Sequence, residues 1–159
     1  MVAAALAGVN SITAPAIAEL TAAKTQEAIQ AVLPGGGEEV DFPETALVST
    51  VYASDTGYAV EVTPGGFDNT ITMMVGVDKS GSVLGISIIS HTETAGLGAV
   101  AAAGTPAGEA FRNEFVGATG SVSVSKDGGE VEAITGATIT SRAVCVGVNA
   151  ALEVVGKMG

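Results

Sequence analysis

Hydrophobic and polar positions divide this chain into segments of helical and of strand-like character. Apolar residues recur at helical spacing over residues 16–33 and again over residues 141–157, with polar or small residues between them. A proline and three glycines follow the first of these segments and end it. Thr105 followed by Pro106 is typical of an N-cap and a first helical position, so we expect a short helix over residues 107–116.

Between the helices, runs of β-branched and aliphatic residues predict strands. Short turns rich in Ser, Asp, Lys and Gly connect them, and this favours hairpins. The expected pairs are 46–53 with 57–63, 70–77 with 82–90, and 121–125 with 130–134. Because tight turns join neighbouring strands, we expect an α+β fold in which helices pack on an antiparallel sheet built from hairpins.

Composition narrows the class of protein. The 159 residues suffice for one domain, and the hydrophobic fraction of 47% indicates a folded one. A net charge of -11 argues against nucleic-acid binding, which needs clustered cations. Cys145 is the single cysteine, so it forms no intramolecular disulfide, and we expect it to be a small buried hydrophobic residue. With one histidine and no CxxC motif, we predict no metal or iron–sulfur site.

Residues 1–9 are apolar, and no basic residue precedes Lys24. The apolar stretch is shorter than the approximately 20 residues that span a bilayer, and it lacks the basic start of a signal peptide. Two interpretations stay open from the residues alone. The segment is either an Ala-rich helical start or the remnant of a truncated transmembrane helix.

The segment between the last expected strand and the last expected helix carries most of the candidate chemistry. It contains a glycine turn and then several hydroxyl groups, directly before the free N–H groups of a helix N-terminus. Such a place suits a phosphate-sized anion, here without a Lys or Arg. Ordinary helix capping is the competing interpretation. The hydroxyl groups belong to Thr135, Thr138, Thr140 and Ser141.

The sequence Thr135-Gly136-Ala137-Thr138, followed by Thr140 and Ser141, resembles the flavinylation motif of FMN-binding domains. These domains occur in the G subunit of Rnf electron-transport complexes and in the C subunit of sodium-pumping NADH:quinone reductase, and the motif here is closer to that of the Rnf protein. The resemblance implies covalent FMN, held as a phosphoester on Thr138. It also implies a separate flavin transferase that takes the FMN moiety from FAD.

A second segment, residues 91–98, resembles the family's flavin-side loop of Glu-Thr-Pro-Gly-Leu-Gly. We interpret His91 as a partly exposed structural residue rather than a proton donor. Met73 and Met74 are expected in the core, although one ring contact among them stays open. The cofactor-binding residues implied by the resemblance are Thr138 as the covalent site, with Thr135, Gly136, Ala137, Thr140, Ser141, Glu93, Thr94, Leu97 and Gly98 around it.

Two positions depart from the family pattern. Glu132 stands where the family has Asp, which bears on how efficiently the transferase recognises the acceptor. Ala95 stands where the family commonly has Pro, which bears on the rigidity of the loop beside the flavin, because proline fixes φ and alanine does not. Neither position touches the acceptor hydroxyl.

The resemblance implies an electron-transfer component of a membrane-bound, ion-translocating redox complex rather than a stand-alone enzyme. Its partners would be the other subunits of an Rnf- or Nqr-type complex and the membrane, reached through an N-terminal anchor in the full-length protein. The flavin domain would lie on the extracytoplasmic side, with residues 1–15 as an anchor remnant or mobile start and 16–159 as the FMN-binding domain. Two alternatives stay open: an FMN-dependent reductase with its own small substrate, and a non-redox extracytoplasmic binding domain.

Overall fold

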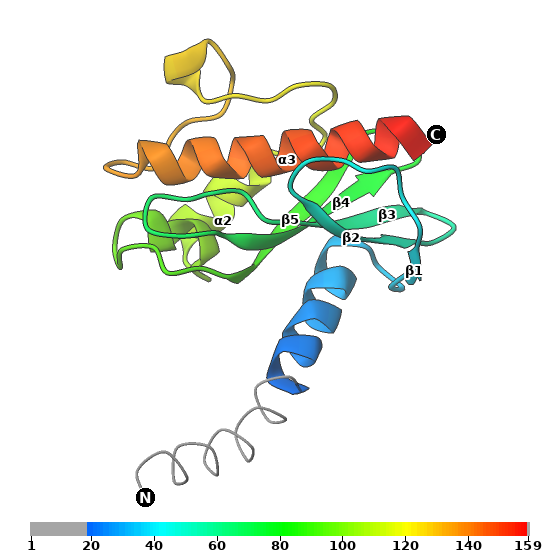
Figure 1. Cartoon of the computed structure of the whole chain (residues 1–159). Helices are drawn as coiled ribbons and strands as arrows, with labels where there is room; N and C mark the ends of the chain where they lie inside the picture. Colours follow the sequence, from blue (N-terminus) through cyan, green and yellow to red (C-terminus); the bar gives the residue numbers. More distant parts are fainter. Residues whose placement is uncertain (1–18, 159) are drawn as a thin grey trace, which may run out of the picture.

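The structure, a computed structural model that describes residues 19–158, is built on one five-stranded antiparallel sheet (Figure 1). The strands follow each other across the sheet in chain order, as expected when tight turns connect neighbours. The predicted α+β fold is therefore confirmed. The strands are β1 (Glu38–Val40), β2 (Val48–Ala53), β3 (Gly57–Val62), β4 (Thr72–Asp78) and β5 (Val83–Ser90).

Strands β2 to β5 correspond to the first two predicted hairpins, with boundaries shifted by one or two residues. The three-residue edge strand β1 was not predicted, because a segment that short has no readable periodicity. The first predicted helix is present over residues 19–32, and helix α2 (Pro106–Asn113) starts after the expected N-cap Thr105. Residues 16–18 of the first helix and the proposed anchor remnant, 1–15, lie outside the described residues.

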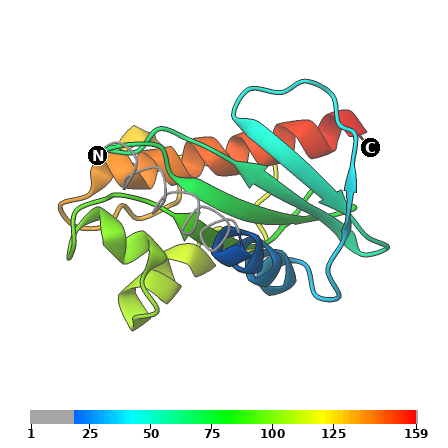
Figure 2. The same cartoon turned by 60° about the horizontal axis from the view of Figure 1, so that its bottom comes forward.

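The sheet is covered by helices on both faces (Figures 1 and 2). The helix of residues 19–32 packs one face through Ala28, Ile29 and Val32, against a cluster that includes Met74 of β4. Leu20, which belongs to the predicted apolar stripe, is instead exposed. The opposite face packs against α3 (Thr138–Met158). Because both faces are covered, the interior strand β4 is a nearly continuous apolar run rather than an alternating one.

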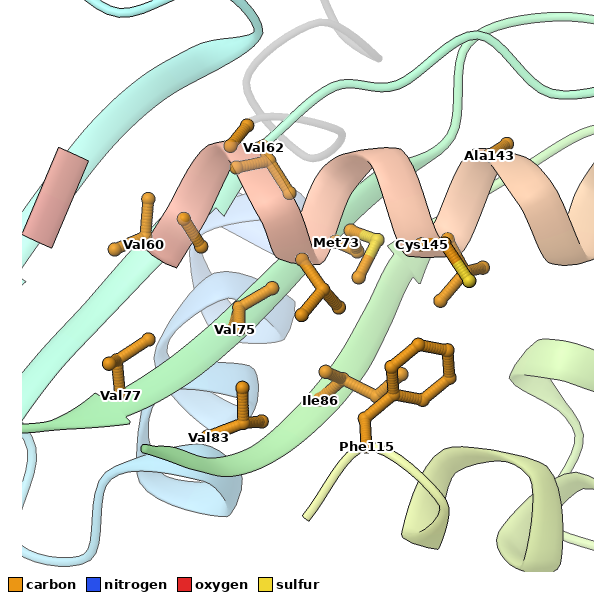
Figure 3. Close-up of a cluster of buried hydrophobic side chains, with 14 of the residues drawn as sticks. Val60, Val62, Met73, Val75, Val77, Val83, Ile86, Phe115, Ala143 and Cys145 are labelled. Atoms are coloured by element: carbon orange, nitrogen blue, oxygen red, sulfur yellow. The ribbon is translucent and has the colours of Figure 1, made fainter. Parts of the chain in front are cut away.

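Helix α3 is also covered on the side away from the sheet. Val124 and Val131, which precede it in the chain, belong to the same core cluster as the inward residues of α3 and of the strands. Figure 3 shows the sheet-side part of this cluster, with Phe115 beside Ile86 and Cys145 above them. By length and composition α3 could span a membrane, but most of it is buried within the domain, as in a core helix.

The third predicted hairpin, 121–125 with 130–134, is wrong. Among the described residues these segments share a single isolated bridge, Val124 with Val131, and it is parallel. The reason lies in α3, where the Asn149 side chain accepts from the Val122 N–H at 2.7 Å and donates to the Val122 carbonyl at 2.9 Å. The alternating valines do face the core, but at Val122 a helix side chain takes the hydrogen bonds that a partner strand would have made.

Cys145 is only 3% exposed, which confirms its predicted packing role. Burial raises the pKa of its thiol to about 11, and the nearby carboxylates of Asp127 and Glu114 add to the effect. The folded protein therefore holds this proton at pH values where the unfolded chain releases it.

This difference predicts a pH-dependent stability. Above the ordinary thiol pKa the unfolded state binds fewer protons, so the free energy of unfolding should fall between about pH 9 and about pH 11. Cys145→Ala has no thiol, so its free energy of unfolding should lack this decrease. Urea unfolding of both proteins across the window measures it, and we expect the advantage of the wild type over the variant to shrink as pH rises. If the free energies of unfolding of the two proteins change in parallel with pH, the raised pKa of the Cys145 thiol is contradicted.

Candidate functional site

A pocket of about 330 Å³ lies at the N-terminus of α3, where the two motif segments meet. Its volume is in the range of small-molecule sites. Most of its wall is apolar, and a few polar side chains interrupt it. The lining residues are Phe67, Glu93, Thr94, Leu97, Gly98, Gly136, Ala137, Thr138, Ile139 and Thr140. Eight of the ten predicted cofactor-binding residues thus surround one cavity, while Thr135 and Ser141 do not line it.

A buried hydrogen bond joins the two motif segments across 47 positions of sequence. The Thr140 hydroxyl in the first turn of α3 donates to Oε2 of Glu93. Gly98 packs directly against this pair, since a Cβ there would lie 2.5 Å from Thr140 Oγ1 and 2.6 Å from Glu93 Oε2. The loop therefore approaches the helix so closely that no side chain fits at position 98.

The turn before α3 depends on Gly136. Its φ of +76° is in the left-handed region, and a Cβ there would meet Leu97 Cδ2 at 3.0 Å. The chain then enters the helix at Thr138, three residues earlier than predicted. Threonine is a weak helix former, so the sequence pattern favoured a loop. In the structure, Ser141 N–H already donates to the Ala137 carbonyl at 3.0 Å.

The hydroxyl groups of the motif differ in what they contact. Thr140 is buried and bonded to Glu93, and Ser141 is fully buried, with its Oγ donating to the Ala137 carbonyl and accepting from the Ile134 N–H. Both hydroxyls therefore hold the turn together, and in the structure their protons are directed to these acceptors. Thr138 is half-buried at the pocket wall. Thr135 is exposed in the turn.

Lys126 supplies a cation that the sequence interpretation missed. It lies in the short 3-10 helix η2 (Ser125–Asp127), and its Nζ donates to Thr138 Oγ1 at 3.4 Å. Next to it, Arg142 of α3 binds Asp127 through two hydrogen bonds of 2.7 and 2.8 Å, which lower the pKa of the Asp127 carboxyl. The expectation of an anion site without Lys or Arg is therefore wrong. Lys126 was missed because it is twelve positions from Thr138 in the sequence, and no local pattern indicates that the two are close.

Two apolar residues of the pocket were also missed. Phe67 is 65% exposed and Ile139 is 49% exposed, and both line the cavity together with Leu97, which is 42% exposed. Large apolar side chains exposed around one cavity are typical of a binding surface. Phe67 comes from the turn between β3 and β4, and only its place in a Pro-Gly-Gly-Phe segment pointed to it.

The remaining candidates occupy structural positions. His91 is half-buried, and its Nδ1 accepts from the Glu93 N–H at 3.2 Å, in agreement with a structural role. Met73 and Met74 are fully buried, and they belong to the two core clusters on opposite faces of the sheet. They do not line the pocket.

The pocket suits a flat aromatic group that carries an anionic tail. Phe67, Leu97 and Ile139 offer apolar contacts, while the Thr138 hydroxyl, the Lys126 ammonium and the first N–H groups of α3 lie together at one end. FMN combines a ring system and a phosphate in this way, so the residues fit that cofactor.

Comparison with known proteins leads to the same cofactor. The sequence model of the family described as "FMN-binding domain" matches residues 66–153, more than half of the chain. The chain is 40% identical over 114 residues to the G subunit of the ion-translocating oxidoreductase complex of Vibrio vulnificus, covering 69% of this chain and 54% of that protein. It is 32% identical over 174 residues to the G subunit of the Na(+)-translocating ferredoxin:NAD(+) oxidoreductase complex of Acetobacterium woodii, covering 94% and 83%.

A third relative, the G subunit of the proton-translocating ferredoxin:NAD(+) oxidoreductase complex of Clostridium ljungdahlii, is 37% identical over 107 residues, covering 64% of this chain and 57% of that protein. The chain thus spans about half the length of the Vibrio and Clostridium relatives and most of the Acetobacterium one. The matched region includes the whole pocket, from Phe67 to Thr140. The chain belongs to the FMN-binding domain family and is similar to the G subunits of ion-translocating oxidoreductase complexes.

Proposed function

We propose that this chain is an electron carrier that holds FMN covalently, as a phosphoester on Thr138, within a membrane-bound ion-translocating redox complex. Membership of the FMN-binding domain family supports the cofactor, and the names of the relatives support the complex. The partners would be the other subunits of an Rnf-type complex and the flavin transferase that loads the domain. An N-terminal anchor in the full-length protein would hold the domain on the extracytoplasmic side.

The position of the Thr138 hydroxyl carries the proposal. Among the hydroxyls of residues 135–141, that of Thr138 is the one that both lines the pocket and has no hydrogen bond to the backbone or to a buried carboxylate. Its hydrogen-bond partner is the ammonium of Lys126. A hydroxyl at the wall of an apolar pocket, beside a cation and a helix N-terminus, is suited to accept a phosphoryl group.

The pocket residues would bind and orient the cofactor. Bound FMN supplies the redox chemistry, and the protein supplies position and electrostatics. Phe67, Leu97 and Ile139 would contact the ring system and exclude water from one side of it. Gly136, which has no side chain, would let the turn approach the phosphate closely, and the first N–H groups of α3 would face it. A covalent link abolishes dissociation, which suits a carrier that works where free FMN is not supplied.

Thr138→Ala should abolish covalent flavin while preserving the fold, because this half-buried side chain is not a member of either core cluster. Both proteins would be incubated with purified flavin transferase, FAD and magnesium, and then followed by intact mass and by flavin fluorescence in a denaturing gel. The wild type should gain one FMN less one water, and the variant should gain nothing.

Thr92→Ala is the matched control, because Thr92 is an exposed threonine of the loop 91–98 that does not line the pocket. It should load like the wild type. Fluorescence that survives denaturation in Thr138→Ala would mean that another residue is the acceptor. A wild type that stays colourless would favour the non-redox binding domain, and steady NAD(P)H oxidation by the isolated loaded domain would favour a reductase.

Glu93 holds the pocket together rather than offering a free carboxylate. Its Oε1 accepts from the N–H groups of Phe67 and Asp68 at 3.0 and 3.3 Å, and its Oε2 accepts from Thr140. One buried side chain thus ties the β3–β4 turn, its own loop and helix α3 together. We infer that its contribution to flavin binding is to position Phe67 and the first turn of α3.

Glu93→Ala should destabilise the fold and slow flavin loading, because it leaves a buried hydroxyl and two N–H groups without an acceptor. The expected loss in free energy of unfolding is about 2–4 kcal/mol. Glu93→Gln keeps an acceptor for the two N–H groups, so its loss should be clearly smaller. Urea unfolding followed by circular dichroism measures both. If Glu93→Ala unfolds at the wild-type urea concentration, the carboxylate does not organise the pocket.

A further inference from the structure

The backbone at Lys126 is anchored on both sides, although the lysine side chain is exposed. Lys126 lies in the middle of η2, between Val124, which is fully buried, and Asp127, which is paired with Arg142. Arg142 is one helical turn after Thr138, so this ion pair attaches η2 to the second turn of α3, directly beside the turn that contains Thr138. The Lys126 Nζ is therefore presented to Thr138 Oγ1 by an anchored segment and not by a free loop.

The charge of Lys126 is not used by another ion pair. In the part of the chain that the structure describes, the ion pairs are Arg142 with Asp127 and Lys157 with Glu153. Because Arg142 already neutralises Asp127, the ammonium of Lys126 leaves a net positive charge beside Thr138. The chain as a whole carries -11, a field that repels anions. A phosphoryl group on Thr138 thus needs a local cation, and Lys126 is placed to provide it.

We propose that Lys126 is the counter-ion of the phosphoryl group carried by Thr138, which rests on Thr138 being the flavin acceptor. In loading, the bond from Thr138 Oγ1 to the FMN phosphorus of FAD forms as the phosphoanhydride bond breaks. AMP leaves with the electron pair, and the hydroxyl proton is released. The product is a phosphodiester with one negative charge. Lys126, which now donates to Oγ1, turns to a non-bridging oxygen and stabilises that charge.

The first measurement is the initial rate of FMN incorporation, with transferase, FAD and magnesium, followed by intact mass. Lys126→Met removes the charge and keeps the length of the side chain, and it should load about fivefold more slowly than the wild type. Lys126→Arg should stay within about twofold, because it restores the charge. Lys79→Met is the matched control, since it removes one exposed lysine from the β4–β5 turn, and it should load normally.

The second measurement separates contact with the phosphate from contact with the transferase. Each protein is loaded to completion, and its phosphodiester is observed by ³¹P NMR. Lys126→Met should shift the resonance, Lys79→Met should leave it in place, and added salt should move the wild type toward Lys126→Met because the pair is exposed to screening. Thermal unfolding of the unloaded proteins checks that the variants fold alike.

An unchanged ³¹P resonance in Lys126→Met would overturn the proposal, even where loading is slow, because the lysine would then serve only the transferase. Equal loading rates for Lys126→Met and Lys79→Met would overturn it as well. A wild type that takes up no FMN would instead refute the acceptor assignment on which it rests.

Discussion

The buried carboxylate of Glu93 is the contact on which the site depends. It receives hydrogen bonds from the β3–β4 turn and from the first turn of α3, two segments that lie far apart in the sequence. A buried carboxylate is costly unless its oxygens are bonded, and here each oxygen has a donor. Glu93 therefore specifies one arrangement of the three segments, and the pocket is the space that this arrangement leaves open.

Helix α3 transmits this constraint to the rest of the domain. Its inner side packs on the sheet, and its outer side packs under Val124 and Val131, so it cannot shift without disturbing the core. Asn149 and Arg142 bind the covering segment at two points, one near the middle of the helix and one in its second turn. The first turn of α3 thus belongs to a helix that is packed on both of its sides, and this gives Thr138 a defined position beside the pocket.

The sequence predicted the parts of the fold that follow from local pattern. Strands β2 to β5 and α2 were readable because hydrophobic periodicity and turn residues agree there. The segment over residues 121–134 did not form the predicted hairpin, because the backbone of Val122 bonds to Asn149 of a distant helix and the bridge between Val124 and Val131 is parallel. In the site, two family-like motifs named eight of the lining residues. Phe67 and Lys126 were missed because only the folded chain brings them to Thr138. Ile139 was missed although it follows Thr138 directly, because the motif is read from its glycine and hydroxyl positions.

The electrostatics of the domain follow from the same arrangement. A strongly acidic chain resists non-specific association with other acidic surfaces, yet its proposed cofactor is itself anionic. The structure meets these opposing demands locally, since Arg142 cancels Asp127 and thereby frees Lys126 to face Thr138. The helix N-terminus adds partial positive charge at the same point. One short segment of the chain thus gives an acidic protein a place where a phosphate is favoured, directly at the hydroxyl that would carry it.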